Sequence, residues 1–139
     1  MAYTTIDNST SFFNTVLYTG NGTNGREITG VGFQPDFVWI KPRSVASSHT
    51  QVDSVRGANG SVMRTIFSNL SDAEESTTSD TNLAYGVVNA ITSDGFTVGS
   101  GNTSDGRTNQ SSATYCSWNW LAGGSASSNG DGSITSSVS

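Results

Sequence analysis

The stretch that most constrains the fold is an apolar run closed at each end by proline, residues 35–42, PDFVWIKP. Proline cannot donate a hydrogen bond to a β-ladder, so both prolines are expected at strand ends. Between them aromatic and branched aliphatic residues alternate, in the order Phe37, Val38, Trp39 and Ile40. Because both alternating faces are apolar, the run predicts a central core strand that is covered on both sides. On that interpretation Trp39→Ala would unfold the domain.

Small polar residues, rather than charged ones, make up much of the remaining chain. Ser, Thr, Asn and Gly number 24, 18, 12 and 16 of the 139 residues, whereas Lys and Arg number 6 and Asp and Glu 11. Ser, Thr and Asn compete for backbone hydrogen bonds and Gly loses the most entropy on ordering, so this composition disfavours long helices. The chain also carries 13 aromatic residues, which supply a core that a disordered low-complexity chain lacks. We therefore expect short strands joined by turns.

Alternating apolar residues predict further strands, with turn signals between them. The segments are SFFNTVLYTG at 11–20, REITGVGF at 26–33, LAYGVVNAIT at 83–92, GFTVGSG at 95–101 and ATYCSWNWLAGG at 113–124. The SDG sequence at 93–95 lies between two apolar runs and predicts a β-hairpin. GNGTNG at 20–25 is interpreted as a second hairpin loop.

Residues 62–77 are the least regular part of the expected domain. VMRTIFSN at 62–69 fits another strand or a short helical turn. Ser71 precedes Glu74 by three residues, the spacing of a capping box, so a short helix or a structured acidic loop is expected at 71–77. Strands at about 10-residue spacing with Gly-rich turns favour an all-β fold, an antiparallel β-sandwich or jelly roll with at most one short helix.

The length of the chain fits one domain with one core. We assign residues 1–122 to the β-sandwich. Residues 123–139, GGSASSNGDGSITSSVS, contain one Ile and one Val and are interpreted as a Gly/Ser-rich exit arm or linker.

Charge and hydropathy exclude two classes of partner. The net charge is −5 and the chain has a single Lys, so no basic stripe follows a phosphate backbone and nucleic acid is not expected. No window approaches the roughly eighteen apolar residues that span a bilayer, so membrane insertion is not expected either. The one cysteine, Cys116, cannot form an internal disulfide.

Catalytic and metal-binding patterns are weak. His49 precedes Asp53 by four residues, but a Ser-His-Asp hydrolase needs a nucleophile on a strained elbow and no G-x-S-x-G occurs. GNGTNG matches a dinucleotide fingerprint, but no helix is expected after it. One His and one Cys cannot close a zinc site, and the carboxylates are too scattered to nominate a glycosidase pair. The sequence therefore predicts a non-enzymatic protein without a cofactor or metal.

Aromatic and charged residues supply the candidate contacts with a ligand or partner. Trp118 and Trp120 share one face of the strand at 113–124 with Cys116, and either pack in the core, which is the favoured role, or form a stacking platform for sugar rings. The role of Tyr115 is open in the same way. His49, Asp53 and Arg56 complete the candidate set.

Asp53 and Arg56, together with Lys41 and Arg43, either form an internal ion-pair set that ties the following loop to the sheet or contact a neighbouring subunit. We favour the internal set.

Several motifs follow one another in a specific order along the chain. They are FFNTVLYTGNGTNGREITGVGFQPDFVWIKPRS, HTQVDSVRG, IFSN, ITSDGFTVGSG and YCSWNWLAGG. Over nearly its whole length the chain resembles virion proteins of tailed bacteriophages, of the kind common in marine phages and described as tail-fibre or other structural proteins.

This resemblance implies a lectin-like β-sandwich on the virion and no catalytic residues. It implies the particle-proximal domain of a tail fibre or surface appendage, self-associated as a symmetric homo-oligomer such as a trimer and in contact with other phage tail or capsid proteins. The alternatives are a capsid decoration protein that stabilises the shell and a module that recognises a host surface glycan.

Overall fold

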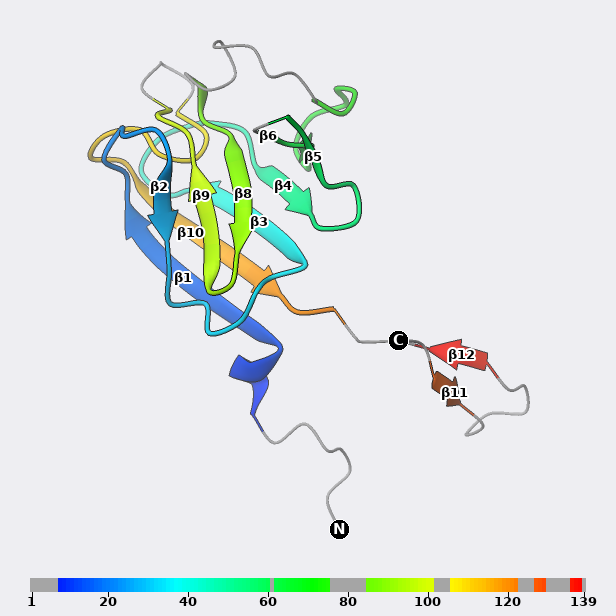
Figure 1. The fold of residues 1–139 in the computed structure, drawn as a ribbon. Helices are drawn as coiled ribbons and strands as arrows, with labels where there is room; N and C mark the ends of the chain where they lie inside the picture. The colour runs from blue at the N-terminus through cyan, green and yellow to red at the C-terminus, as the bar shows by residue number, and fades with distance from the viewer. Residues whose placement is uncertain are drawn as a thin grey trace.

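The computed structural model describes residues 8–60, 62–75, 85–101, 106–122, 127–129 and 136–138 (Figure 1). The elements whose bounds lie in these residues are one 3-10 turn at Ser9–Ser11 and twelve strands. The strands are β1 Phe13–Thr19, β2 Arg26–Ile28, β3 Phe37–Pro42, β4 Thr50–Asp53, β5 Ala58–Asn59, β6 Val62–Met63, β7 Ile66–Phe67, β8 Val88–Thr92, β9 Gly95–Val98, β10 Thr114–Trp120, β11 Ser127–Asn129 and β12 Ser136–Val138.

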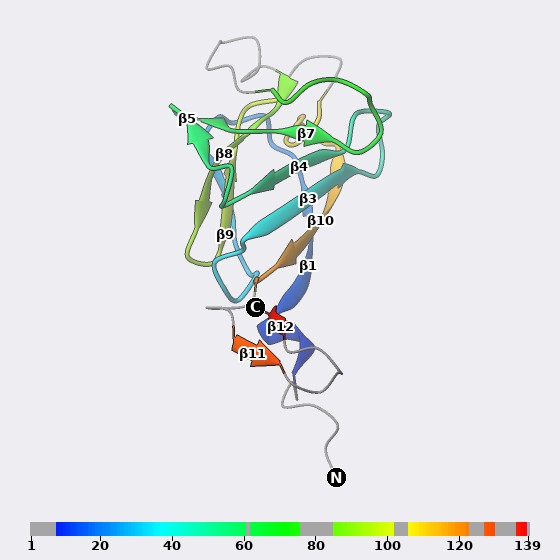
Figure 2. The same cartoon turned by 90° about the vertical axis from the view of Figure 1, so that its right-hand side faces the viewer.

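Two antiparallel sheets form the body of the protein. A five-stranded sheet has the order β1-β10-β3-β4-β7, and a three-stranded sheet has the order β2-β9-β8. Figures 1 and 2 show the three-stranded sheet lying over one side of the five-stranded sheet. The prediction of an all-β antiparallel sandwich is confirmed.

The hydrophobic core lies between the two sheets. The five-stranded sheet contributes Val38, Ile40, Val52 and Tyr115, and the three-stranded sheet contributes Ile28, Val88, Phe96 and Val98. All but Ile28 have no exposed surface. Removing such side chains from water provides about 1.5–3 kcal/mol each, which makes this layer the main source of stability.

Among the described residues only one side of β3 is covered, which corrects the expectation for this strand. Val38 and Ile40 face the three-stranded sheet and are fully buried, whereas Phe37 and Trp39 point to the other side and remain partly exposed. Figure 2 shows no further layer of described residues on that side. Apolar residues on both faces of the strand predicted a packed layer on each side of it, but the described part of the chain provides such a layer on one side only, the three-stranded sheet.

The orientation of β10 also differs from the favoured interpretation. Tyr115, Ser117 and Asn119 point into the core, so the face with Trp118 and Trp120 points outward. Burial of the polar pair is possible because each is hydrogen-bonded. The Ser117 hydroxyl lies 3.4 Å from the Val16 carbonyl oxygen, and the Asn119 amide donates to the Asn14 carbonyl at 3.1 Å.

Of the two hairpin loops predicted from turn sequences, at 93–95 and at 20–25, one is a hairpin and the other is not. The hairpin expected at 93–95 joins β8 to β9, with Thr92 opposite Gly95. The loop at 20–25 is not a hairpin, because it leads from β1 in one sheet to β2 in the other. The buried amide of Asn109 holds this loop by donating to the Thr23 and Gly99 carbonyls at 2.9 and 3.0 Å.

The segment at 71–75 contains no helix, so the structured acidic loop is the correct alternative there. Glu75 forms an isolated bridge with Thr65 instead, and the remainder of the predicted 71–77 segment lies outside the described residues. In the segment interpreted as an arm, β11 and β12 pair as a two-stranded ribbon that projects away from the sandwich (Figure 1). The other residues of 123–139 lie outside the described ranges.

Candidate functional site

Five aromatic side chains gather on the outer side of the five-stranded sheet, the side turned away from the core. They are Phe13 from β1, Trp118 and Trp120 from β10, and Phe37 and Trp39 from β3, and we call them the aromatic face. Trp120 lies between Phe13 and Phe37, with ring centroids 5.0 and 5.2 Å away. Trp118 lies opposite Trp39 at 5.5 Å. Adjacent antiparallel strands thus hold the rings in contact across three strands.

All three tryptophans of the chain belong to the aromatic face. Each of its five side chains is half-buried, and apolar surface continues from it to Leu17, which is 60% exposed. The indole nitrogen of Trp39 is buried and has no hydrogen-bond partner among the described residues. Gathered apolar side chains of this kind, unlike scattered apolar residues, make this surface a candidate binding site.

Polar side chains share the rows of the aromatic face. Thr15 lies opposite Trp118 on β1, and Gln51 lies opposite Trp39 on β4. Both lie at the ends of the tryptophan pair, where a hydroxyl and an amide can form hydrogen bonds with a molecule resting on the rings.

One corner of the aromatic face is basic. Lys41 follows Trp39 on the same side of β3 and lies opposite Cys116, and its ammonium donates to the Pro42 carbonyl at 2.9 Å. The ring of His49 lies 6.5 Å from that of Trp39. Burial and then the charge of Lys41 lower the pKa of His49, so this imidazole is neutral near pH 7.

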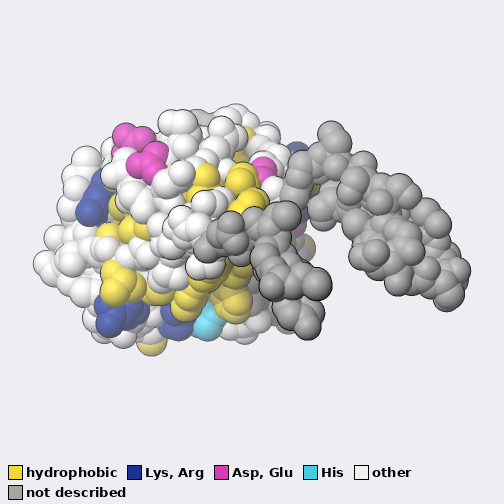
Figure 3. Space-filling view, turned by 90° about the horizontal axis from the view of Figure 1, so that it is seen from below, with side chains coloured by type: hydrophobic (Ala, Val, Ile, Leu, Met, Phe, Trp, Pro, Cys, Tyr) yellow, Lys and Arg dark blue, Asp and Glu magenta, His cyan; other side chains and the backbone are white. Residues whose placement is uncertain are grey.

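Arg43, the next residue on this side of the chain, is exposed and follows the end of β3. Burial raises the pKa of the Cys116 thiol, and the nearby charge of Arg43 opposes that rise. We call Lys41 and Arg43, with the neutral His49 beside them, the basic corner. Figure 3 shows basic side chains and the histidine beside hydrophobic side chains at the lower edge of the molecule.

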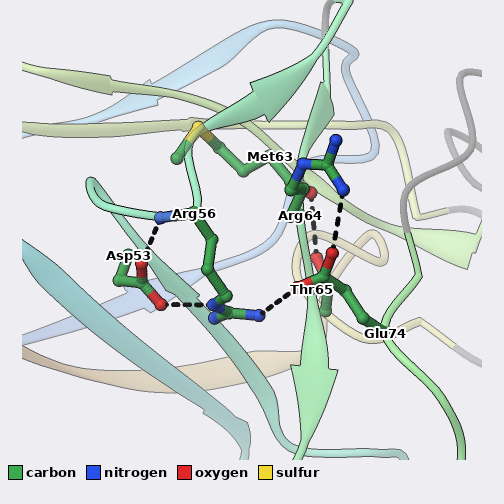
Figure 4. Close-up of polar contacts among 6 residues, drawn as sticks. All are labelled: Asp53, Arg56, Met63, Arg64, Thr65 and Glu74. Carbon is green, nitrogen blue, oxygen red and sulfur yellow. Dashed lines mark hydrogen bonds and ion pairs between the residues drawn. The ribbon is translucent and has the colours of Figure 1, made fainter.

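An ion-pair network lies beyond the other end of the aromatic face, where Asp53 is opposite Phe37. The guanidinium of Arg56 contacts Asp53 at 2.5 Å and Glu74 at 3.2 Å, and Glu74 also pairs with Arg64 at 3.0 Å (Figure 4). Partial burial would raise the pKa of Asp53, but hydrogen bonds from the Arg56 backbone and side chain lower it.

The internal pairing of Asp53 with Arg56 is therefore confirmed. Lys41 and Arg43 do not join it, because they lie at the basic corner. Sequence reasoning missed Glu74 as the second partner of Arg56, since 18 residues separate the two and no local spacing connects them.

Residues 8–139 match the protein family described as Domain of unknown function (DUF7483). The chain belongs to this family. No curated protein and no solved structure matches it. Within the described ranges of the DUF7483 chain, no helix is long and apolar enough to cross a membrane.

Acidic groups of the DUF7483 chain are engaged in structural contacts. Asp94 accepts hydrogen bonds from the backbone amides of Gly32 at 2.6 Å and Gly30 at 3.0 Å, which lower its pKa. Hydrogen bonds from Arg64 and then Arg56 lower the pKa of Glu74. A general acid near neutral pH needs the opposite shift. Among the described residues no three His, Cys, Asp or Glu side chains lie close enough to hold a metal ion.

The structure does not join His49 to Asp53 as a catalytic pair. The His49 ring packs beside Trp39, whereas Asp53 is held by Arg56. Both belong to the surroundings of the aromatic face, at different ends of it.

Tyr115 is the candidate contact that the structure contradicts. It is fully buried, its hydroxyl donates to the Gly106 carbonyl at 2.7 Å, and its ring stacks on Tyr18 at 5.0 Å. Tyr115 is an odd number of residues from Trp118 and Trp120 along β10. Because side chains alternate along a strand, it faces the core while the two tryptophans face outward. The DUF7483 site therefore combines the two tryptophans of β10 with Trp39, which sequence reasoning had placed in the core.

Proposed function

We propose that this DUF7483 chain is a non-enzymatic structural domain of a tailed-bacteriophage virion. Its place is the particle-proximal domain of a tail fibre or a related surface appendage, where it self-associates as a symmetric oligomer. The observation that carries the proposal is the ordered set of motifs FQPDFVWIK, DSVRG and SDGFTVG. These motifs lie on β3, on the turn after β4 and on the β8–β9 hairpin, which are parts of the sandwich and its connections.

The chemistry of the carboxylates supports a binding role over catalysis. Asp53, Glu74 and Asp94 have lowered pKa values and each contacts an arginine or backbone amides. Ionised, internally bonded carboxylates stabilise a scaffold, and none of these three is a proton donor for hydrolysis at neutral pH.

The composition of the chain supports a place at the surface of a particle. About half of the residues are Ser, Thr, Asn or Gly and few are charged, so hydrogen bonds from small polar groups dominate what it presents to a partner. Closed symmetric assembly suits repeated positions on a particle.

Immunogold labelling of virions from the phage that encodes this chain tests the proposal. The antibody is raised against the purified domain, and the same antibody absorbed with that domain is the control. Gold restricted to the tail or its fibres is the expected result. Gold over the whole shell would replace the fibre assignment with capsid decoration, and absence of gold from both intact and disrupted particles would refute a virion role.

A further inference from the structure

We propose that the aromatic face and the basic corner together form a binding site for an acidic saccharide, a glycan whose sugar rings carry carboxylates as in hexuronates. The inference does not depend on a virion location, because it rests on the side chains of this one surface.

The aromatic face offers apolar ring surface on which a sugar ring can rest. Trp118 and Trp39 lie side by side with centroids 5.5 Å apart, and both are partly exposed on the same side of the sheet. Aromatic rings offer a large apolar surface with few rotatable bonds, so they cover the C–H face of a pyranose at a low entropic cost. Because they stand on hydrogen-bonded strands, they are in position before the ligand arrives.

The hydrogen-bonding groups beside the rings match sugar hydroxyls. Thr15 and Gln51 flank the Trp118 and Trp39 pair in the same row. Sites for small molecules combine an apolar surface with a few such polar groups, which set the orientation of the ligand.

Charge identifies the ligand as acidic. Arg56, Arg64 and Arg107 are held by Asp53, Glu74 or Glu75 in ion pairs of 2.5–3.2 Å. Lys41 and Arg43 have no carboxylate within ion-pair distance in the described part of the chain. In a chain of net charge −5, two cations that form no ion pair with a described residue stand next to the aromatic face. A carboxylate on the sugar complements them.

A second copy of the protein fits this surface less well. Two copies packed through the same face would each present Lys41 and Arg43, while Asp53, the carboxylate in the rows of this face, is already neutralised by Arg56. A carboxylated glycan supplies in one molecule both the apolar ring face and the negative charge.

Tryptophan fluorescence and calorimetry test the proposal directly, because all three tryptophans lie on this face. The probes are hexamers of galacturonate and of mannuronate, and their methyl esters are the matched neutral ligands. We expect at least one acidic hexamer to change the fluorescence and to bind about tenfold more tightly than its ester. Absence of binding by both acid hexamers, or equal affinity for acid and ester, overturns the proposal.

Two variants separate the two parts of the site. Trp118→Ala removes half of the ring pair and is expected to weaken binding of acid and ester alike by about tenfold or more. Lys41→Gln combined with Arg43→Gln keeps the rings and is expected to remove the preference for the acid. Arg64→Gln is the control, since it removes a cation that pairs with Glu74 away from this face, and it should bind as the unmodified protein does.

Sedimentation of the same proteins distinguishes a subunit interface. A protein that is oligomeric without ligand and becomes monomeric with Trp118→Ala would show that the face binds a second copy, which overturns the saccharide assignment. Circular dichroism confirms that each variant is folded. If the saccharide fails to bind while gold labels the tail, the saccharide site is refuted and the proposed virion function is not.

Discussion

Trp118 lies directly opposite Trp39 on the neighbouring strand, with the two rings 5.5 Å apart on the side of the sheet away from the core. The next residue along β10, Asn119, is fully buried on the opposite side. Because side chains alternate along a strand, these placements depend on each other. A shift of one residue in register would bury the tryptophan and expose the asparagine.

Phe96→Ala and Trp39→Ala should differ strongly in stability. Phe96 is fully buried between the sheets, and its loss is expected to cost about 3–5 kcal/mol. Trp39 is partly exposed, so its replacement should cost about 1–2 kcal/mol and leave the domain folded. Urea denaturation followed by far-UV circular dichroism measures both. Equal losses would show that the outer side of β3 is covered as well.

The Asp94→Asn variant tests whether the Asp94 carboxylate stabilises the loop at Gly30 and Gly32, through the pH dependence of the free energy of unfolding. Hydrogen bonds from the Gly32 and Gly30 amides lower the pKa of the Asp94 carboxyl. A lowered pKa stabilises the folded state above the unfolded pKa of about 3.9, and that contribution is lost as the pH falls through the folded value. The original protein should therefore exceed the variant in stability at pH 7, and the difference should shrink by pH 3.

Urea denaturation at the two pH values measures this difference. Asp72→Asn is the control, since Asp72 is exposed and its replacement should change stability little. A difference in the free energy of unfolding between the original protein and Asp94→Asn that is the same at pH 3 and pH 7 would contradict a stabilising role of the ionised Asp94 carboxylate.

Arg56→Ala should weaken the domain without unfolding it. The Arg56 side chain is 24% exposed and pairs with Asp53 and Glu74, and partly exposed pairs of this kind contribute about 1 kcal/mol. Thermal unfolding of Arg56→Ala beside Phe96→Ala provides the comparison. An Arg56→Ala protein that melts as low as the core variant would mean that the network, rather than the core, holds the 54–57 turn and the 70–75 segment together.

Asn109→Ala should release the loop at 20–25. Asn109 is fully buried. Its side-chain amide nitrogen donates to the Thr23 and Gly99 backbone carbonyls, and its side-chain oxygen accepts from the Asn21 backbone amide at 3.1 Å. Truncation leaves the buried Gly99 carbonyl and the part-buried backbone groups of Thr23 and Asn21 without these hydrogen bonds, which costs about 1–3 kcal/mol.

Hydrogen exchange of the Asn21 amide reports the release of this loop. Faster exchange is expected in Asn109→Ala and unchanged exchange in Asn69→Ala, because Asn69 accepts from the His49 amide at the surface. Full protection of Asn21 in the Asn109 variant would show that the loop is held by other contacts.

The sequence by itself determined the elements that depend on neighbouring residues. The strand after Pro35, the strand at 114–120 and the hairpin at 93–95 follow from alternation and turn chemistry, and together they indicate an antiparallel sandwich. The pairing of Asp53 with Arg56 was also predictable, since three residues separate them across one turn.

Only the tertiary structure decided which side of each central strand is inside. β10 is inserted between β1 and β3, and its Ser117 and Asn119 can be buried because β1 supplies carbonyl oxygens about one hundred residues away in the chain. The same insertion turns Trp118 outward beside Trp39. Alternation determines that two faces differ, but which face is covered depends on packing and hydrogen bonds between distant segments, and no local pattern contains that information.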